Sequence, residues 1–541
     1  MERWEIFDKS VIIYGNQVHD VESILTSKLF YEICQSFLAK NTYLVSKLNF
    51  VLTTNYFIEL TTSLFLDKDI YKSSLVKENR DYLYDLYNAL YDYWRSFKRY
   101  CILSKNSNVL ELSKITDNSN LKILTLYRKI TERLKETKYL VYRKLPAFCN
   151  AIFSTMKIKT LKDYNVQCLN KILISPPFII NTKVNKRISN FIVTKQNILN
   201  DILLDDNFLA YQIYVGKLKT IIYFHKKYSH HIISLAHLYE AIDLKKRTKN
   251  FDIVLFLGVK SSDNMKIYQD DKPTYYGILS DLESNDYFGY VKKILLTMHN
   301  LIVIDHKKLP IHGCGFEIEF TNGKKKNIVL VGDSGVGKSE TLANIRSQYA
   351  RQVSKINIIF DDMGYLILKD QEIYFSGTEI GAFVRLDDLD PGWAYDQIDR
   401  SIFINPNKIN ARIVMPINDY KSITAQYPLS AIFYVNNYDS QTGLYFFNDL
   451  TKAIETFTSG WRLTKGTTNE QGLVSSFFAN PFGPLQRQAQ TTKLIKTFFP
   501  IIFKKYKIGI LYSNLGLTDI NYQEALSLTT KALIDYIEED N

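Results

Sequence analysis

The residues from Gly332 to Ser339 form the clearest chemical motif of the chain. They read Gly-Asp-Ser-Gly-Val-Gly-Lys-Ser and fit the phosphate-loop pattern G-x-x-x-x-G-K-[ST] completely. Glycines let such a loop curl until its backbone N–H groups point at phosphate oxygens, and the following helix N-terminus adds partial positive charge. We expect Lys338 to reach the β- and γ-phosphates and Ser339 to offer its hydroxyl to a bridging Mg²⁺. The loop predicts an ATP site made by Gly332, Asp333, Ser334, Gly335, Val336, Gly337, Lys338 and Ser339.

Two adjacent carboxylates, Asp361 and Asp362, follow the apolar run at 356–360. Carboxylates at the end of a buried strand are costly unless a cation meets them, and hard cations prefer carboxylate oxygens. We therefore expect this pair to face a phosphate-bound Mg²⁺ or Mn²⁺. The alternative interpretation is a helix cap or a turn.

The elements that would hold these motifs alternate between strands and helices. Short apolar runs at 251–258, 327–331 and 356–360 predict buried strands, and the spacing of the apolar residues at 525–533 predicts a helix. Alternation of this kind is typical of an α/β fold. We expect an α/β connecting region at 201–280 and a nucleotide-binding catalytic domain at 281–541.

The first 200 residues predict a mainly helical region instead. Leu25, Leu29, Ile33 and Phe37 recur every four residues, and the segment from Leu83 to Phe97 repeats this pattern. Glycine is scarce here and no motif carries chemistry. We therefore expect 1–200 to act as a scaffold or as a surface for a protein partner.

Composition excludes several classes of protein. The 541 residues are long enough for a full core without disulfides or metals, and Gly plus Pro content is too low for a disordered or collagen-like chain. The net charge of +12 is spread over the length, so we do not expect nucleic-acid binding. The five cysteines form no C-x-x-C pair, and neither a signal peptide nor an apolar run of membrane-spanning length is found. These features predict a cytoplasmic protein that contacts no membrane.

A series of further motifs surrounds the loop and the aspartate pair. A lysine pair is by itself typical of solvated surface and a histidine of a satisfied core position, but the order of these segments is more specific than any one of them. In chain order they are Tyr287–Lys293 (YFGYVKK), Leu309–Cys314 (LPIHGC), the phosphate loop, Asp361–Asp362, Ala411–Ile417 (ARIVMPI), Phe457–Trp461 (FTSGW), Gly466–Thr467 and Phe477–Phe482 (FFANPF).

This order resembles the ATP-dependent phosphoenolpyruvate carboxykinases over about residues 280 to 541. The resemblance implies a carboxykinase-like kinase core that decarboxylates oxaloacetate and phosphorylates the resulting enolate. It implies that Lys293, His312 and Asp362 hold Mn²⁺ near the γ-phosphate, and a neutral lysine ligand requires a lowered pKa. Arg412 would neutralise charge between the substrate and the transferred phosphoryl group, and Tyr287 would line the substrate pocket. With Lys338, these residues would form the catalytic and substrate-binding set, while Ser339 and Asp361 would join the metal ligands.

Two other functions are compatible with the sequence. The loop through Glu340 also resembles the bacterial HPr kinase/phosphorylases, structural cousins of the carboxykinases that phosphorylate a protein serine. A non-catalytic ATP-binding scaffold is the third class. The carboxykinases grip the substrate carboxylate with an arginine in a Gly-Arg-Ser-Pro-like segment, and we identify no such segment from the sequence.

Overall fold

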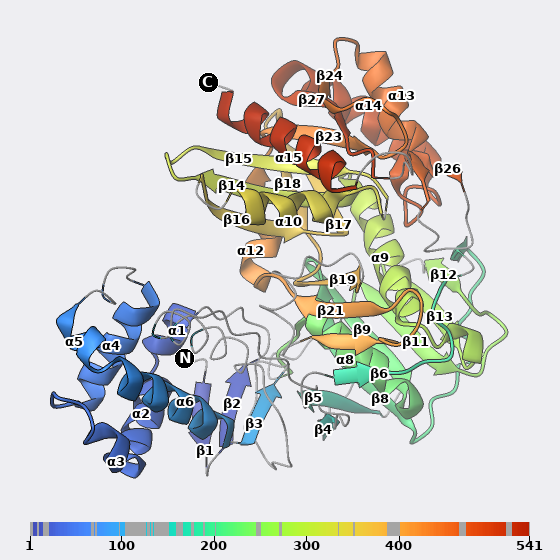
Figure 1. Ribbon diagram of the computed structural model, residues 1–541. Coiled ribbons are helices and arrows are strands. Elements are labelled where there is room, and N and C mark those ends of the chain that lie inside the picture. The colour runs from blue at the N-terminus through green and yellow to red at the C-terminus, as the bar shows by residue number, and fades with distance from the viewer. Residues whose placement is uncertain are drawn as a thin grey trace. The chain divides into compact units, whose positions relative to one another are not determined.

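The computed structural model of the chain is drawn in Figure 1. Its contacts divide the chain into two compact units, which we describe separately. Unit 1 comprises Met1–Phe153, Lys171–Ile179 and Ala394–Ile402, and unit 2 comprises Ser154–Asn170, Ile180–Trp393 and Phe403–Asn541. The residues that the structure describes are 4–7, 10–14, 21–66, 70, 73–96, 98–102, 126, 130, 134, 151–157, 166–174, 178–187, 190–200, 202–244, 250–269, 273–333, 335–349, 352–386, 401–464, 472–515 and 522–539.

Unit 1 contains the helices that the four-residue spacing predicts. In α2 (Lys28–Lys40), Leu29, Ile33 and Phe37 are buried, because residues four apart lie on one face of a helix. They pack with one face of α6 (Arg80–Ser96), which contributes Trp94, and with the other helices of the unit. Those helices are α1 (Val21–Leu25), α3 (Thr42–Val45), α4 (Thr54–Leu66) and α5 (Ser74–Glu78).

Strands also occur within the first 200 residues, so the prediction of a mainly helical region is wrong for these segments. Most are short, and several pair with strands far away in the chain, which periodicity along the chain does not reveal. For example, β7 (Ile192–Thr194) pairs with β12 (Lys266–Gln269), more than 70 residues later. The other early strands are β1 (Trp4–Phe7), β2 (Ser10–Tyr14), β3 (Lys98–Ile102), β4 (Ala151–Lys157), β5 (Gln167–Ile174) and β6 (Phe178–Ile180).

The first sheet of unit 2 carries the helix on which two site lysines lie. Its strands run in the order β8-β9-β11-β13-β12-β7, and every residue of β11 is buried, as its apolar run predicts. Helix α9 (Phe288–Asp305) packs on β11 and β13 and is buried over most of its length. The remaining elements here are β8 (Phe208–Val215), β9 (Leu218–His225), α8 (Ser229–Leu238), β11 (Ile253–Val259) and β13 (Tyr275–Ser280).

The second sheet of unit 2 holds the phosphate loop and is covered on both faces. Its order is β22-β18-β17-β14-β15-β23-β27-β24, with β16 paired to β14. Side chains of a strand alternate between faces. On β15, Ile328 and Leu330 therefore pack with α10 and α15, whereas Val329 and Val331 pack with α13 and α14 (Figure 1).

The strands and helices of this second layer confirm the expected alternation. The predicted strands at 327–331 and 356–360 and the predicted helix at 525–533 all form. Their bounds and those of their neighbours are β14 (Leu309–Phe320), β15 (Lys325–Val331), α10 (Lys338–Gln348), β16 (Val353–Phe360), β17 (Met363–Lys369), β18 (Glu372–Gly377), β22 (Tyr427–Pro428), β23 (Ala431–Asn436), β24 (Gly443–Phe446), α13 (Leu450–Ser459), α14 (Gln488–Lys505), β27 (Lys507–Tyr512) and α15 (Tyr522–Glu539).

A small antiparallel pair completes the surroundings of the site. β19 (Gly381–Arg385) pairs with β21 (Arg412–Pro416), and this register sets Arg385 opposite Arg412. The fold is α/β, with helices and several mixed sheets, as the sequence predicts. Among the described residues, no helix combines the length and the apolar character that crossing a membrane requires.

Candidate functional site

The phosphate loop lies between a buried strand and a helix. β15 ends at Val331 and α10 begins at Lys338, which is the strand–loop–helix context that the motif needs. Gly337 precedes the helix with φ of 106°, and a Cβ there would lie 2.6 Å from a methyl carbon of Leu515, so glycine is required. Of the predicted loop residues, Ser334 and the side chain of Ser339 lie outside the described part of the structure.

The ammonium of Lys338 points into the loop. Only 6% of this residue is exposed. Its Nζ donates to the carbonyl oxygens of Gly332 at 2.9 Å and Asp333 at 2.7 Å. Through these two hydrogen bonds, the Lys338 ammonium holds the loop together. It lies at the place where the phosphate-loop motif requires a positive charge.

Asp333 connects the loop to the rest of the site. One of its carboxylate oxygens accepts a hydrogen bond from Nε of Arg462 at 2.8 Å, and the other lies 3.4 Å from Nδ1 of His312. Arg462 belongs to β25 (Trp461–Leu463) and is buried. The sequence analysis missed Arg462, although it directly follows the Phe457–Trp461 motif.

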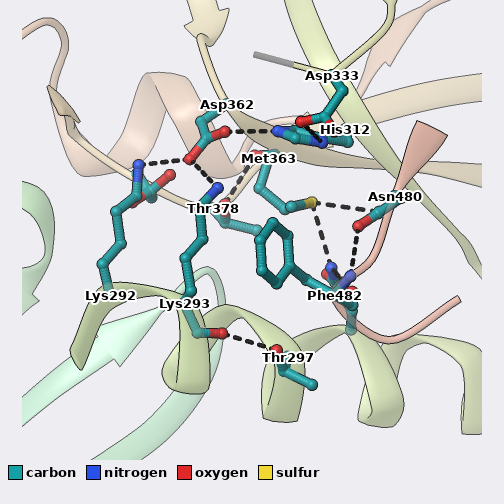
Figure 2. A network of polar contacts seen from close by, with 12 residues as sticks. Lys292, Lys293, Thr297, His312, Asp333, Asp362, Met363, Thr378, Asn480 and Phe482 are labelled. Atoms are coloured by element: carbon teal, nitrogen blue, oxygen red, sulfur yellow. Dashed lines mark hydrogen bonds and ion pairs between the residues drawn. The ribbon is translucent and has the colours of Figure 1, made fainter. Parts of the chain in front are cut away.

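Asp362 is the centre of a buried polar cluster (Figure 2). Its Oδ2 accepts hydrogen bonds from the ammonium groups of Lys292 at 2.5 Å and Lys293 at 2.7 Å. Its Oδ1 lies 2.9 Å from Nε2 of His312, whose Nδ1 lies 3.0 Å from the carbonyl oxygen of Ala479. The structure thus brings together Lys293, His312 and Asp362, which come from α9, β14 and the turn between β16 and β17.

The two neighbouring lysines have opposite pKa shifts. Burial lowers the pKa of Lys293 against the attraction of the Asp362 carboxylate, and the Lys292 ammonium lowers it further. Burial opposes charge on Lys292 too, but the carboxylates of Asp362 and Glu379 outweigh it, so the pKa of Lys292 is raised. The ammonium of Lys293 is therefore easier to deprotonate than that of Lys292.

Burial also acts on the partners of the lysines. Burial would raise the pKa of Asp362, but Lys292 and Lys293 hold it well below its usual range. Burial lowers the pKa of His312, which favours the neutral imidazole. A carboxylate and a neutral imidazole donate electron pairs to a metal ion, and the lowered pKa of Lys293 makes the neutral amine form of that side chain easier to reach.

Glu379 is a member of the cluster that the sequence analysis missed. One of its oxygens lies 3.3 Å from Nζ of Lys292 and accepts a hydrogen bond from the hydroxyl of Tyr239 at 3.2 Å. Burial raises the pKa of Glu379 to about 7. It follows β18 without any recognisable motif, and it is the second carboxylate that pairs with the Lys292 ammonium.

Two phenylalanine rings, those of Phe482 and Phe383, each contact two cationic side chains. The Lys293 ammonium lies 4.4 Å from the centre of the Phe482 ring, and the guanidinium of Arg187 lies 4.8 Å from the same centre. Phe383 likewise has Lys292 at 5.6 Å and Arg412 at 5.4 Å. Each ring thus binds one lysine of the pair and one arginine through its π face.

Arg412 and Tyr287, both predicted from the sequence, meet at Phe383. The Tyr287 ring centre lies 6.3 Å from that of Phe383, and Tyr287 is buried. The Nε of Arg412 is buried and has no hydrogen-bond partner among the described residues. A buried guanidinium donor of this kind is suited to an anion.

Arg187 is an arginine beside the Phe482 ring that the sequence analysis did not single out. It follows β6 in the segment 182–187, which the backbone and side chain of Asn405 fix in place. Asn405 is buried, accepts a hydrogen bond from the N–H of Thr182 at 2.8 Å, and donates to the side-chain oxygens of Thr182 at 2.9 Å and Asn185 at 3.0 Å. The only local signal was the run Lys186-Arg187, which on its own is typical of solvated surface.

The remaining predicted residue, Asp361, directly precedes Asp362 in the turn between β16 and β17.

No protein-family model matches the chain, and no curated protein matches it.

Proposed function

We propose that this chain is an ATP-dependent carboxykinase-like enzyme that converts oxaloacetate to phosphoenolpyruvate. One observation carries the proposal: Lys293 and His312 converge on the two oxygens of Asp362, and His312 also reaches Asp333 of the phosphate loop. A group of potential metal ligands is thus joined directly to a nucleotide motif. The roles of all these residues remain predictions, and so does their resemblance to the carboxykinase family.

ATP would bind with its phosphates in the loop between β15 and α10. Lys338 would exchange the carbonyl oxygens of Gly332 and Asp333 for phosphate oxygens. The Lys338 ammonium would thus have hydrogen-bond acceptors in both states. Arg462 would keep the Asp333 side chain turned away from the phosphates through its hydrogen bond.

The donor set fits the metals that this chemistry uses. Lys293, His312 and Asp362 would hold Mn²⁺, because their donor atoms already cluster and their pKa shifts favour the ligating forms. Ser339 and Asp361 would serve the Mg²⁺ of ATP. When bound, such cations supply stabilisation of negative charge on the enolate and on the phosphates.

Oxaloacetate would be held by the two arginines. It is a small dianion, and guanidinium groups bind carboxylates through paired hydrogen bonds. Arg187 and Arg412 lie on the two phenylalanine rings that also bind the lysine pair, so both are next to the cluster. Contact with the rings would limit the movement of both guanidinium groups before the substrate arrives.

In the reaction, the bond to the departing carboxylate breaks and CO₂ leaves. The electron pair passes to the carbonyl oxygen and gives an enolate. That oxygen attacks the γ-phosphorus of ATP, and the bond to the β-phosphate oxygen breaks to release ADP. Arg412 and the ammonium of Lys292 would stabilise the charge that develops during both steps.

The test is phosphoenolpyruvate formation from ATP, Mg²⁺, Mn²⁺ and oxaloacetate by the purified full chain. We expect product only when oxaloacetate is present. Arg187→Ala should raise KM for oxaloacetate at least about tenfold, and Arg412→Ala should lower kcat at least about a hundredfold, both with ATP binding retained. Lys355→Ala, an exposed position on β16, is the control for loss of a positive charge. Tight ATP binding without any product at millimolar oxaloacetate would refute the carboxykinase reaction and direct the search to another acceptor.

A further inference from the structure

We propose a second metal site, made by His230, His231 and Asp286 and suited to a divalent transition metal such as Zn²⁺ or Co²⁺. The three residues lie in unit 2, on the first turn of α8 and at the residue before the N-cap of α9. They share no residue with the Asp362 cluster. The proposal does not depend on the reaction proposed above.

The geometry matches that of three ligands on one face of a metal ion. Nε2 of His230 lies 2.7 Å from Oδ1 of Asp286, and Nε2 of His231 lies 3.0 Å from the same oxygen. All three donor atoms lie within 4.8 Å of one another. Ligands that bind at about 2.0–2.2 Å and are about 90–110° apart are separated by about 2.8–3.6 Å. The two histidine–carboxylate separations lie in or close to this range, and the separation of the two imidazole donor atoms is at most 4.8 Å.

The surrounding residues orient both imidazoles toward the carboxylate. The His231 ring stacks between the rings of Tyr228, at 6.1 Å, and Phe288, at 6.2 Å. The two imidazole ring centres are 4.0 Å apart. Two histidines with one carboxylate form a ligand set that binds iron, zinc and related metals and leaves open positions for water.

One side of the site is open to solvent. The side chain of His231 is 1% exposed, but those of His230 and Asp286 are 24% and 25% exposed. An ion could therefore enter from water while His231 anchors it from within. The neighbouring Lys227 pairs with Asp281, not Asp286, so the ion pairs of Asp286 among the described residues involve histidines alone.

A bound metal would join two helices at a position close to the proposed active site. Asp286 directly precedes Tyr287, the N-cap of α9, and α9 carries Lys292 and Lys293 little more than one turn later. Linking Asp286 to α8 would fix the start of α9. This site would therefore have a structural role, since none of its ligands lies at the phosphate loop.

The experiment uses the full chain, stripped with a chelator and titrated with Co²⁺. Co²⁺ bound to histidine gives visible absorption bands, and Zn²⁺ should displace it. We expect the double variant His230→Gln/His231→Gln to lose one equivalent of bound Co²⁺, and Asp286→Asn to weaken that equivalent at least tenfold. His312→Gln should retain it, and so should His306→Gln, an exposed histidine at the end of α9.

Unchanged Co²⁺ stoichiometry and affinity in the double histidine variant would overturn the proposal, because the residues would then form only a hydrogen-bonded group. Circular dichroism and melting in chelator identify any variant that does not fold. For that case, single variants His230→Gln and His231→Gln provide the same readout. Zn²⁺ should also raise the Tm of the wild-type chain and of His306→Gln, but not that of either single variant.

Discussion

Two carboxylates of this molecule, Asp362 and Asp286, each contact histidine, yet their surroundings have opposite electrostatics. Asp362 is shared by two lysines of α9 and one histidine of β14, and arginines lie just beyond. Asp286 meets two adjacent histidines of one helix. The first group has an excess of positive charge and is suited to anionic substrates. Among the described residues no lysine or arginine pairs with Asp286, so the second group is suited to a cation.

The contrast also concerns what each carboxylate does for the fold. Removing a carboxylate that faces buried ammonium groups leaves those charges without compensation, whereas removing one that faces imidazoles at a site partly open to solvent leaves polar groups near water. The two positions therefore differ in how far a single substitution should disturb the protein. Four experiments follow from this difference, from the largest expected effect to the smallest.

Asp362→Asn should have the largest effect. It leaves the Lys292 and Lys293 ammonium groups buried without their shared partner, so we expect the free energy of unfolding to fall by about 3–5 kcal/mol. Phosphoenolpyruvate formation by this variant should become undetectable. Asp286→Asn is the matched comparison and should cost no more than about 1–2 kcal/mol. Urea denaturation of both variants measures this, and equal losses would contradict the assigned difference between the two carboxylates.

Lys338→Ala should weaken ATP binding at least about a hundredfold, because the loop loses its one full positive charge at the phosphates. Isothermal titration calorimetry measures the affinity, with Lys355→Ala as the control. Co²⁺ binding at His230 and His231 should be unchanged in the same variant. ATP affinity equal to that of the wild type would rule out the phosphate-loop interpretation.

Replacing each lysine of the pair by methionine should separate their roles. Lys293→Met removes a proposed ligand and should weaken Mn²⁺ binding about 10–100-fold, as measured by electron paramagnetic resonance titration. Lys292→Met keeps that ligand set and should bind Mn²⁺ at least as well as the wild type, while kcat falls. A stronger loss of Mn²⁺ in Lys292→Met than in Lys293→Met would reverse the assignment.

Asn405→Ala should have the smallest of these effects. It removes the hydrogen bonds that hold the Arg187 segment to the loop after residue 404 but no charge. We expect KM for oxaloacetate to rise about three- to tenfold, with kcat and ATP affinity nearly unchanged. The double variant with Arg187→Ala should be no worse than Arg187→Ala alone; additive losses would show that Asn405 acts on something else.

Much of unit 2 could be predicted from the sequence because its signals are local. The apolar run before Gly258 and the strand–loop–helix around Lys338 depend on neighbouring residues, and both form. Lys293, His312 and Asp362 were grouped by the order of their motifs, and the structure brings them together. That they bind a metal remains a prediction.

The residues that the sequence did not reveal are positioned by distant segments. Arg187 reaches the site through the ring of Phe482, nearly 300 residues later in the chain. Glu379 is identified only by its contacts with Lys292 and Tyr239. Similarly, β7 is a strand because β12 pairs with it, which no property of its three residues indicates. Sequence patterns reveal structure that depends on residues close together in the chain. The positions of Arg187, Glu379 and β7 depend instead on contacts between distant segments.

The hydrogen bonds of Lys338 to the carbonyl oxygens of Gly332 and Asp333 have a consequence for selectivity among nucleotides. Any phosphate that enters the loop must compete with these two internal acceptors for the same ammonium. A monophosphate makes few contacts that compensate for the hydrogen bonds Lys338 gives up. A triphosphate adds further oxygens that contact the backbone N–H groups of the loop and the N-terminus of α10. The affinity of the loop for a nucleotide should therefore rise steeply with the number of phosphate groups, from AMP through ADP to ATP.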